Sequence, residues 1–249
     1  MSDPSDRVHD QTEGPPRFTT TRWTVVLEAA QPDSPGGMEA FARLYRDYWY
    51  PLYAYVRRRG YAQHEAEDLT QDFFVSLIKR QRLAGLEREG GRFRSFLLKA
   101  LQNFLANEWD RAMAQKRGGG QSIVPLEEVD AESRFLADST TETPEAAFDR
   151  NWAYAIIEHA MEHLEAELRS AGKESILPQL RLHLQGDRGG RPYAEIAAEW
   201  GLSESAVKTT VHRLRQRYGR LLRAEVARTV GDDAEAEREL RHLIEVVSG

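Results

Sequence analysis

The chain is 249 residues long, 41% of them hydrophobic, with no cysteine and a formal net charge of −6. The lack of cysteine excludes disulfide frameworks, thiolate metal sites and cysteine nucleophiles, and it suits a reducing compartment. No apolar run approaches the roughly 18 to 20 residues that a membrane-spanning helix needs, and the polar N-terminus has no apolar signal segment, so we expect a cytoplasmic protein with no membrane partner.

Acidic and basic residues are separated along the chain. Residues 79–117 contain ten Lys or Arg and four Asp or Glu, whereas residues 118–150 contain two and eight. Residues 203–223 contain six basic residues and one acidic residue, and residues 229–249 contain two and six. Because charges more than about 8 Å apart are screened at physiological salt, the basic blocks matter more to a polyanion such as DNA than the acidic total does.

The first half of the chain has helical periodicity. Residues 1–18 are rich in Asp, Pro, Ser and Gly, and we expect them to form a disordered leader. From there to residue 117, apolar residues recur at spacings of three and four, and no segment alternates with the period of two that a strand requires. The predicted helices cover residues 24–30, 38–59, 63–83 and 93–116. Residues 19–117 are therefore predicted to form one helical domain, with Pro51 as a candidate kink.

The second half opens with an acidic segment that lacks helical periodicity. Residues 118–150 are acidic and show no sustained period, so they are predicted to be a flexible linker. Helices predicted over 152–169 and 176–184 then begin a second domain, residues 151–228. The acidic tail at 229–249 is weakly amphipathic, and the sequence leaves open whether it covers a surface or extends freely. The predicted fold class is all-α, with two small helical domains.

The second domain carries a helix-turn-helix pattern, YAEIAAEWGLSESAVKTTVHRLRQRYGRLL, at residues 193–222. Two helices are predicted there, over 194–200 and 204–222. Gly201 suits a left-handed residue in the turn, and Ser203 stands where an N-cap belongs. In such motifs the second helix lies in the DNA major groove. The alternative is a basic, solvated helix in an ordinary helical bundle.

Spacing divides this second helix into an apolar face and a polar face. The residues predicted to face the core are Val207, Val211, Leu214, Tyr218 and Leu221, together with Ile196, Ala197 and Leu202 before the helix. The N-terminal half of the polar face is predicted to contact bases, and the arginines that follow are better placed for phosphates. The predicted DNA contacts are Ser205, Lys208, Thr209, His212, Arg213, Gln216 and Arg217.

This pattern resembles the C-terminal domain of bacterial RNA polymerase sigma factors of the extracytoplasmic-function (ECF) type, within the sigma-70 family. A second segment, AEDLTQDFFVSLI at residues 66–78, resembles the helix with which these factors bind core polymerase. The resemblance implies a non-enzymatic protein that needs no cofactor or small-molecule substrate. It implies binding to core RNA polymerase and to promoter DNA, as melted strand at the minus-ten element and as duplex at the minus-thirty-five element. Whether an anti-sigma factor also binds is left open.

The resemblance also implies roles for individual residues. Through the motif D-L-x-Q-[DE]-x-F, the implied core polymerase contacts are Asp68, Gln71, Asp72 and Phe74. The implied contacts with the minus-ten element are Arg92, Arg94, Lys99, Asn103, Asn107, Arg111, Lys116 and Arg117. Without the family, the helix at 63–83 would simply have a solvated acidic face. Spacing favours a core position over a base-stacking role for Phe96, Phe104 and Trp109.

Catalytic and metal chemistry find little support in the sequence. The glycines at 118–120 are not followed by the Lys-Ser or Lys-Thr of a phosphate loop. His159 and His163 are four residues apart on one predicted helix, but no third ligand is evident. Two rival functions stay open: a stand-alone helix-turn-helix regulator whose N-terminal bundle senses a ligand or dimerises, and a purely structural helical adaptor.

Overall fold

The computed structural model describes residues 36–79, 92–114, 131–138, 141–184, 190–230 and 232–248. Within these ranges all secondary structure is helical, which confirms the all-α class. The helices are α2 (Gly37–Arg58), α3 (Gln63–Lys79), α4 (Phe93–Ala114), α5 (Ala131–Ala137), α6 (Pro144–Ser170), α7 (Ile176–Leu184), α8 (Tyr193–Trp200), α9 (Glu204–Ala227) and α10 (Asp233–Ser248). The predicted leader at 1–18 and the predicted helix at 24–30 lie outside the described residues.

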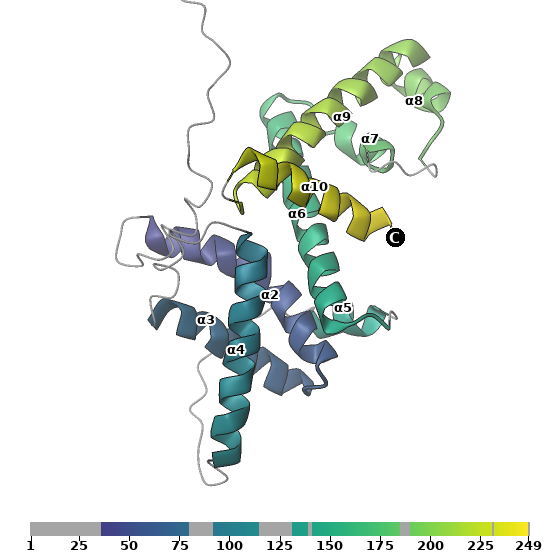
Figure 1. Ribbon diagram of the computed structural model, residues 1–249. Helices are drawn as coiled ribbons and strands as arrows, with labels where there is room; N and C mark the ends of the chain where they lie inside the picture. The colour runs from purple at the N-terminus through teal and green to yellow at the C-terminus, as the bar shows by residue number, and fades with distance from the viewer. Residues whose placement is uncertain are drawn as a thin grey trace, which may run out of the picture.

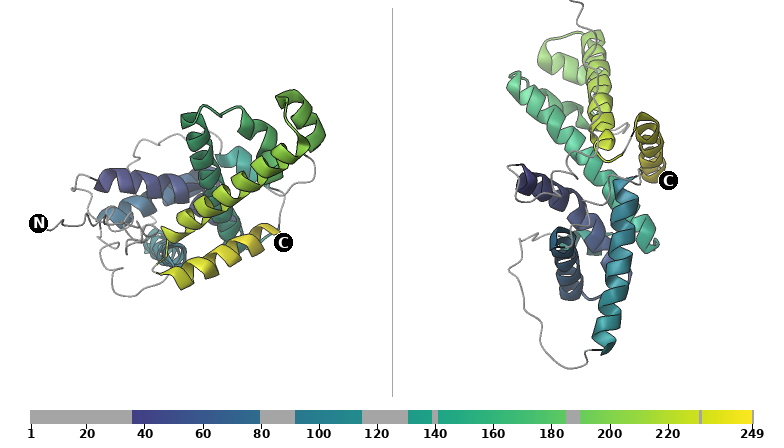
Figure 2. Two further views of the ribbon diagram at one scale, coloured as in Figure 1. Left: turned by 90° about the horizontal axis from the view of Figure 1, so that it is seen from above. Right: turned by 60° about the vertical axis from the view of Figure 1, so that its left-hand side comes forward.

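The helices form an elongated arrangement (Figures 1 and 2). Helices α2, α3 and α4 gather at one end, and α7 and α8 lie at the other. The 27-residue helix α6 runs between the two ends and packs against both α2 and α9. Helix α10 packs against α6 and α9, so the C-terminal segment lies beside the middle of the molecule.

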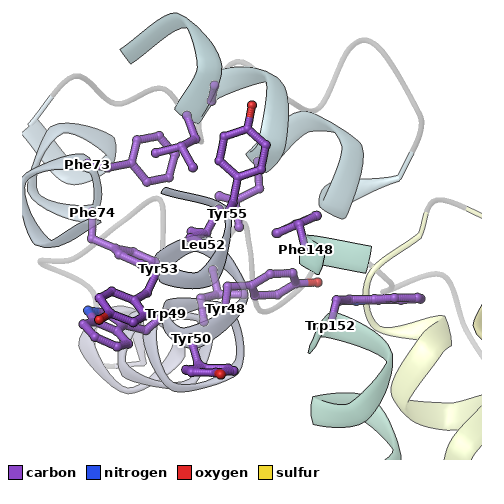
Figure 3. Close-up of a cluster of buried hydrophobic side chains, with 14 of the residues drawn as sticks. Tyr48, Trp49, Tyr50, Leu52, Tyr53, Tyr55, Phe73, Phe74, Phe148 and Trp152 are labelled. Carbon is purple, nitrogen blue, oxygen red and sulfur yellow. The ribbon is translucent and has the colours of Figure 1, made fainter. Parts of the chain in front are cut away.

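Helix α2 is the centre of the main core. Every residue from Tyr48 to Val56 is buried, so this half of the helix is covered on all sides. A helix that is apolar all round belongs in an interior, and α2 packs on α3 and on α6. Figure 3 shows Tyr48 pointing toward Trp152, with Phe148 beside it, both on α6. The aromatic side chains of two distant segments therefore share one core.

The segment predicted to be a flexible linker contains helices. Helix α5 lies within residues 118–150, and α6 begins there at Pro144. The Thr143 side chain caps α6 by accepting a hydrogen bond from the Ala146 N–H at 3.2 Å. Proline at the first helical position suits that start. Helix α5 and the residue after it bind α2 through ion pairs: Glu132 pairs with Arg57 at 2.7 Å and Asp138 with Arg58 at 3.1 Å. Helix α6 packs on α2 directly.

The described residues show no boundary between two cores at this segment. The main hydrophobic cluster includes Ala40 in α2, Phe148 in α6, Val226 in α9 and Leu243 in α10. Of two smaller clusters, one joins the second half of α6 to α7 and to the middle of α9, and the other joins α7 to α8 and to the first part of α9. The independence of two domains stays a prediction, and the tail at 229–249 is largely the packed helix α10. None of the described helices combines the length and apolar character that crossing a membrane requires.

Candidate nucleic-acid and polymerase interface

Helices α8 and α9 form the predicted helix-turn-helix. Helix α8 ends at Gly201, which has φ 64° and ψ 30°. Glycine adopts this left-handed conformation without a steric penalty. The Leu202 N–H donates to the Ala197 carbonyl at 2.9 Å, which satisfies a free carbonyl at the end of the helix. The Ser203 side chain accepts from the Ala206 N–H at 3.2 Å and so caps α9. The predicted turn and cap are both confirmed.

A small apolar cluster holds the two helices together. Its buried members are Leu180, Ile196, Ala197, Val207 and Val211. Leu214, Tyr218 and Leu221 are partly buried against the neighbouring cluster, so the predicted apolar face of α9 is confirmed. The prediction for Leu202 is wrong: this residue, which directly follows the left-handed Gly201, is 50% exposed.

The predicted base-reading residues of α9 lie on the surface. Ser205, Lys208, Thr209, His212, Arg213 and Gln216 are all exposed. A hydrogen bond from Lys208 to Glu204, with a 2.7 Å ion pair, raises the pKa of Lys208. The His212 and Gln216 side chains contact each other at 3.1 Å. This exposed face presents hydrogen-bond donors and positive charge together.

Two arginines farther along α9 are engaged within the molecule. Arg217, a predicted DNA contact, donates to Glu167 of α6 at 2.7 Å and is half-buried. Arg215 donates twice to the carbonyl of His183, at 2.7 and 3.1 Å, and so satisfies the C-terminal end of α7. Both side chains hold α9 in place, which spacing along one helix does not reveal.

Helix α4 presents only part of its predicted DNA-binding set. Lys99, Asn103 and Asn107 are exposed. Helix α4 also includes Arg111, of whose side chain nothing is described, and Lys116 and Arg117 lie outside the described residues.

The three aromatic residues of α4 that spacing places in the core differ in their burial. Phe104 is buried as predicted, and Phe96 is partly buried. Trp109 is 58% exposed, so the core position predicted for it is wrong. Trp109 lines an open pocket together with Tyr55 and Tyr61.

The two arginines at the start of α4 are held by acidic residues. Arg94 is only 6% exposed and donates to Glu239 of α10 at 2.9 and 3.2 Å. It also pairs with Asp149 of α6, and its guanidinium lies 4.8 Å from the Trp152 ring. Arg92 is about half exposed and lies 3.4 Å from Glu239. As the molecule is arranged here, Arg94 is therefore not available to DNA.

Helix α3 carries the residues implied to contact core polymerase. Asp68 and Asp72 are exposed and Gln71 is partly exposed. Phe74 is 3% exposed and its ring packs against Phe41 and Tyr45 of α2, at centroid distances of 6.0 and 4.8 Å. Phe74 therefore serves the α2–α3 contact in this structure, and the acidic residues beside it form the accessible surface.

The two histidines of the predicted pair on α6 have separate partners. His159 faces Asp47 at 3.5 Å, whereas His163 faces Glu225 at 3.3 Å, so the two rings have different carboxylate partners. No group of three metal-ligating side chains occurs among the residues that the structure describes.

The geometry so far defines an all-helical protein with an exposed helix-turn-helix and an acidic helical surface. A family model described as ECF sigma factor matches residues 34–224, and the chain belongs to this family. No curated protein and no solved structure matches the chain. As a member of the family it is a sigma factor: it binds core RNA polymerase and promoter DNA, directs promoter-specific transcription initiation, and is not itself an enzyme.

Sequence reasoning missed Glu239 and Asp149 as partners of Arg94. The signal available was the alternation of basic and acidic blocks, since Arg94 lies in a basic block and both partners lie in acidic ones. Charge blocks indicate that partners exist. Only the tertiary structure shows which residues pair, because Asp149 and Glu239 are 55 and 145 positions from Arg94 in the sequence.

Proposed function

We propose that α9 reads the minus-thirty-five element as duplex DNA, with the exposed residues of its N-terminal half in the major groove. The single observation that carries this proposal is the exposed face from Ser205 to Gln216 at the start of a capped helix. A recognition helix needs base-edge donors on one side and an apolar anchor on the other, and α9 has both. Arg213 is the strongest candidate for a guanine contact because it is exposed and can donate two hydrogen bonds.

The test begins with in vitro transcription by core polymerase carrying this chain, with mapping of the start sites to identify a promoter. On that promoter, Arg213→Ala should weaken binding by about 1–3 kcal/mol and relax discrimination at one base pair of the minus-thirty-five element. Arg220→Ala is the matched control, because it removes the same charge from an exposed position farther along α9. The control should weaken binding to matched and mismatched promoters by the same factor. If Arg213→Ala leaves both affinity and discrimination unchanged, α9 does not read bases through this residue.

We propose further that the exposed part of α4, with Lys99, Asn103 and Asn107, contacts the minus-ten element. These side chains supply one positive charge and two amides on one helix, which suits the backbone and bases of a melted strand. Core polymerase and promoter DNA are cytoplasmic in bacteria, so we infer that the protein acts there.

The acidic surface of α3 is proposed to bind core polymerase through Asp68 and Asp72. Charged groups on a rigid helix suit docking onto a basic partner surface. Asp68→Ala should reduce the affinity for core polymerase several-fold, as measured by fluorescence titration with labelled chain. Glu65→Ala is the control, because it removes an exposed acidic residue from the first turn of the same helix. Equal affinities for the two variants would place the docking surface elsewhere.

A further inference from the structure

Helix α10 lies beyond the part of the chain that the family model matches. The match ends at residue 224, and α10 runs from Asp233 to Ser248. Ala236, Glu239 and Leu243 are its buried residues, and Leu243 belongs to the main core. The helix is therefore a packed element of this chain rather than a loose extension.

The polar contacts of α10 converge on the start of α4. Glu239 is completely buried, and both of its carboxylate oxygens accept hydrogen bonds from Arg94. Asp149 of α6 binds the same guanidinium, and His242 of α10 lies 3.3 Å from Asp149. The α9–α10 junction adds a backbone contact, since the Phe93 N–H donates to the Thr229 carbonyl at 3.0 Å. The first residues of α4 thus contact the segment that carries α10.

A carboxylate that accepts hydrogen bonds from an arginine with both oxygens occupies the guanidinium N–H groups that could otherwise bind a phosphate. Arg92 and Arg94 both lie in the basic block at residues 79–117, and Glu239 contacts both. Glu239 is buried, so its carboxylate would be an unpaired buried charge if Arg94 left while α10 stayed in place. Such a charge carries a large desolvation penalty. Release of Arg94 is therefore coupled to withdrawal of α10 from its site.

We propose that α10 is an intramolecular clasp: it occupies the basic start of α4 and competes there with single-stranded DNA. The clasp also joins α4 to the C-terminal part of α9, where Arg223 pairs with Glu237 at 2.8 Å. Its withdrawal releases the guanidinium donors of Arg92 and Arg94 that Glu239 holds. This inference rests on the proposed contact between α4 and the minus-ten element.

The test uses the full chain and a mixed-sequence DNA single strand about 20 nucleotides long, because phosphate contacts need no particular promoter. Glu239→Gln removes the charge and keeps the shape, and it should raise affinity for the strand several-fold. Each phosphate contact that the released arginines add would also steepen the salt dependence, by roughly 0.7 in the slope of log affinity against log salt. Arg94→Ala in the Glu239→Gln background should remove the gain.

Glu245→Gln is the matched control, because it removes the same charge from an exposed position on the same helix. The clasp is overturned if Glu239→Gln binds no more tightly than Glu245→Gln, or if its gain survives Arg94→Ala. Failure of the proposed α4–DNA contact is distinguishable: Lys99→Ala would then leave strand affinity unchanged in the wild-type chain. If the clasp alone is wrong, the effect of Lys99→Ala remains.

A second measurement does not depend on the stability of Glu239→Gln. The chain has no cysteine, so Ala106→Cys in α4 and Arg241→Cys in α10, both at exposed positions, take two spin labels specifically. The distance distribution between the labels should be narrow in the free protein and longer in the presence of saturating single strand. An unchanged distribution in the saturated complex overturns the clasp.

Discussion

Arginine side chains hold distant parts of this molecule together. Arg57 donates to Glu132 of α5 at 3.0 and 2.7 Å, and the Tyr53 hydroxyl donates to the same carboxylate. The guanidinium of Arg57 also lies 4.6 Å from the Phe135 ring. A planar guanidinium can pair with a carboxylate and lie over an aromatic ring at once, which lysine cannot reproduce. Arg57 thereby fastens α5 to α2.

Glu132 provides a residue-scale prediction about pH. The hydrogen bonds from Arg57 lower the pKa of Glu132, so its contribution to stability is complete above the pKa of the unfolded chain and is lost as pH falls through the lowered value. Glu132→Gln should reduce the free energy of unfolding by about 1–3 kcal/mol at neutral pH. Denaturant titrations should show this difference shrinking in acid.

The control for this prediction is Glu162→Gln, at an exposed position on α6. It should change stability by no more than about 0.5 kcal/mol at either pH. A deficit of Glu132→Gln that stays constant from neutral pH to below the lowered pKa would show that the carboxylate's charge contributes nothing.

At the scale of the element, α9 combines two tasks in one helix of 24 residues. Its first part packs with α8 in a small cluster through Val207 and Val211. Its last part reaches the main core through Val226, which is completely buried. Because one rigid helix spans both regions, it fixes the position of the DNA-reading residues relative to the main core.

Two glycines near this element should respond oppositely to the same substitution. Gly201 has φ 64°, and no neighbouring atom would obstruct an added Cβ there. The cost of Gly201→Ala is therefore backbone strain alone, roughly 1–2 kcal/mol. Gly219 lies inside α9 with open space around it. Gly219→Ala should stabilise the protein by about 0.5–1 kcal/mol, because alanine favours the helix interior.

Thermal and denaturant unfolding of the two variants measures both effects. Each variant serves as the control for the other, since both add one methyl group at a position with open space. If both substitutions shift stability in the same direction, the turn at Gly201 does not have the conformation described.

At the scale of the whole molecule, apolar contacts are distributed unevenly. The main cluster draws on α2, α3, α4, α5, α6, α9 and α10, whereas the helix-turn-helix relies on two small clusters. Regions with few buried apolar contacts open at a lower free energy than the global unfolding does. The DNA-reading end should therefore be the less stable end.

Hydrogen exchange tests this difference. Amide protons of α7 and α8 should exchange faster than those of the buried half of α2.

Val207 is completely buried in the small cluster. Val207→Ala should cost about 2 kcal/mol, so it should speed exchange in α7 and α8 and leave α2 unchanged. Val56→Ala, the same substitution at a completely buried position in the main cluster, should speed exchange in α2. Equal effects of both variants throughout the chain would mean that the molecule opens only as one unit.

Much of the helical framework is predictable from the sequence because it depends on neighbours three and four residues apart. Apolar spacing predicts α7 with the same bounds as the structure and the start of α4 at Phe93. The conformation of Gly201 and the cap at Ser203 also follow from local chemistry. The family follows from two local motifs and is confirmed by the match over residues 34–224.

Only the tertiary structure decides which surfaces remain available. Phe74 and Arg94 are both motif residues that could face a partner, yet Phe74 packs on α2 and Arg94 is buried by Glu239. The acidic segments likewise contain helices α5 and α10, whose carboxylates pair with arginines that are distant in sequence. Spacing along one helix sets which residues share a face, whereas burial and ion pairing depend on what other segments bring to that face. The sequence by itself therefore determined the turn, the family and most of the helices outside the acidic segments, and the packing of α2, α6 and α10 decided which of the predicted contacts are exposed.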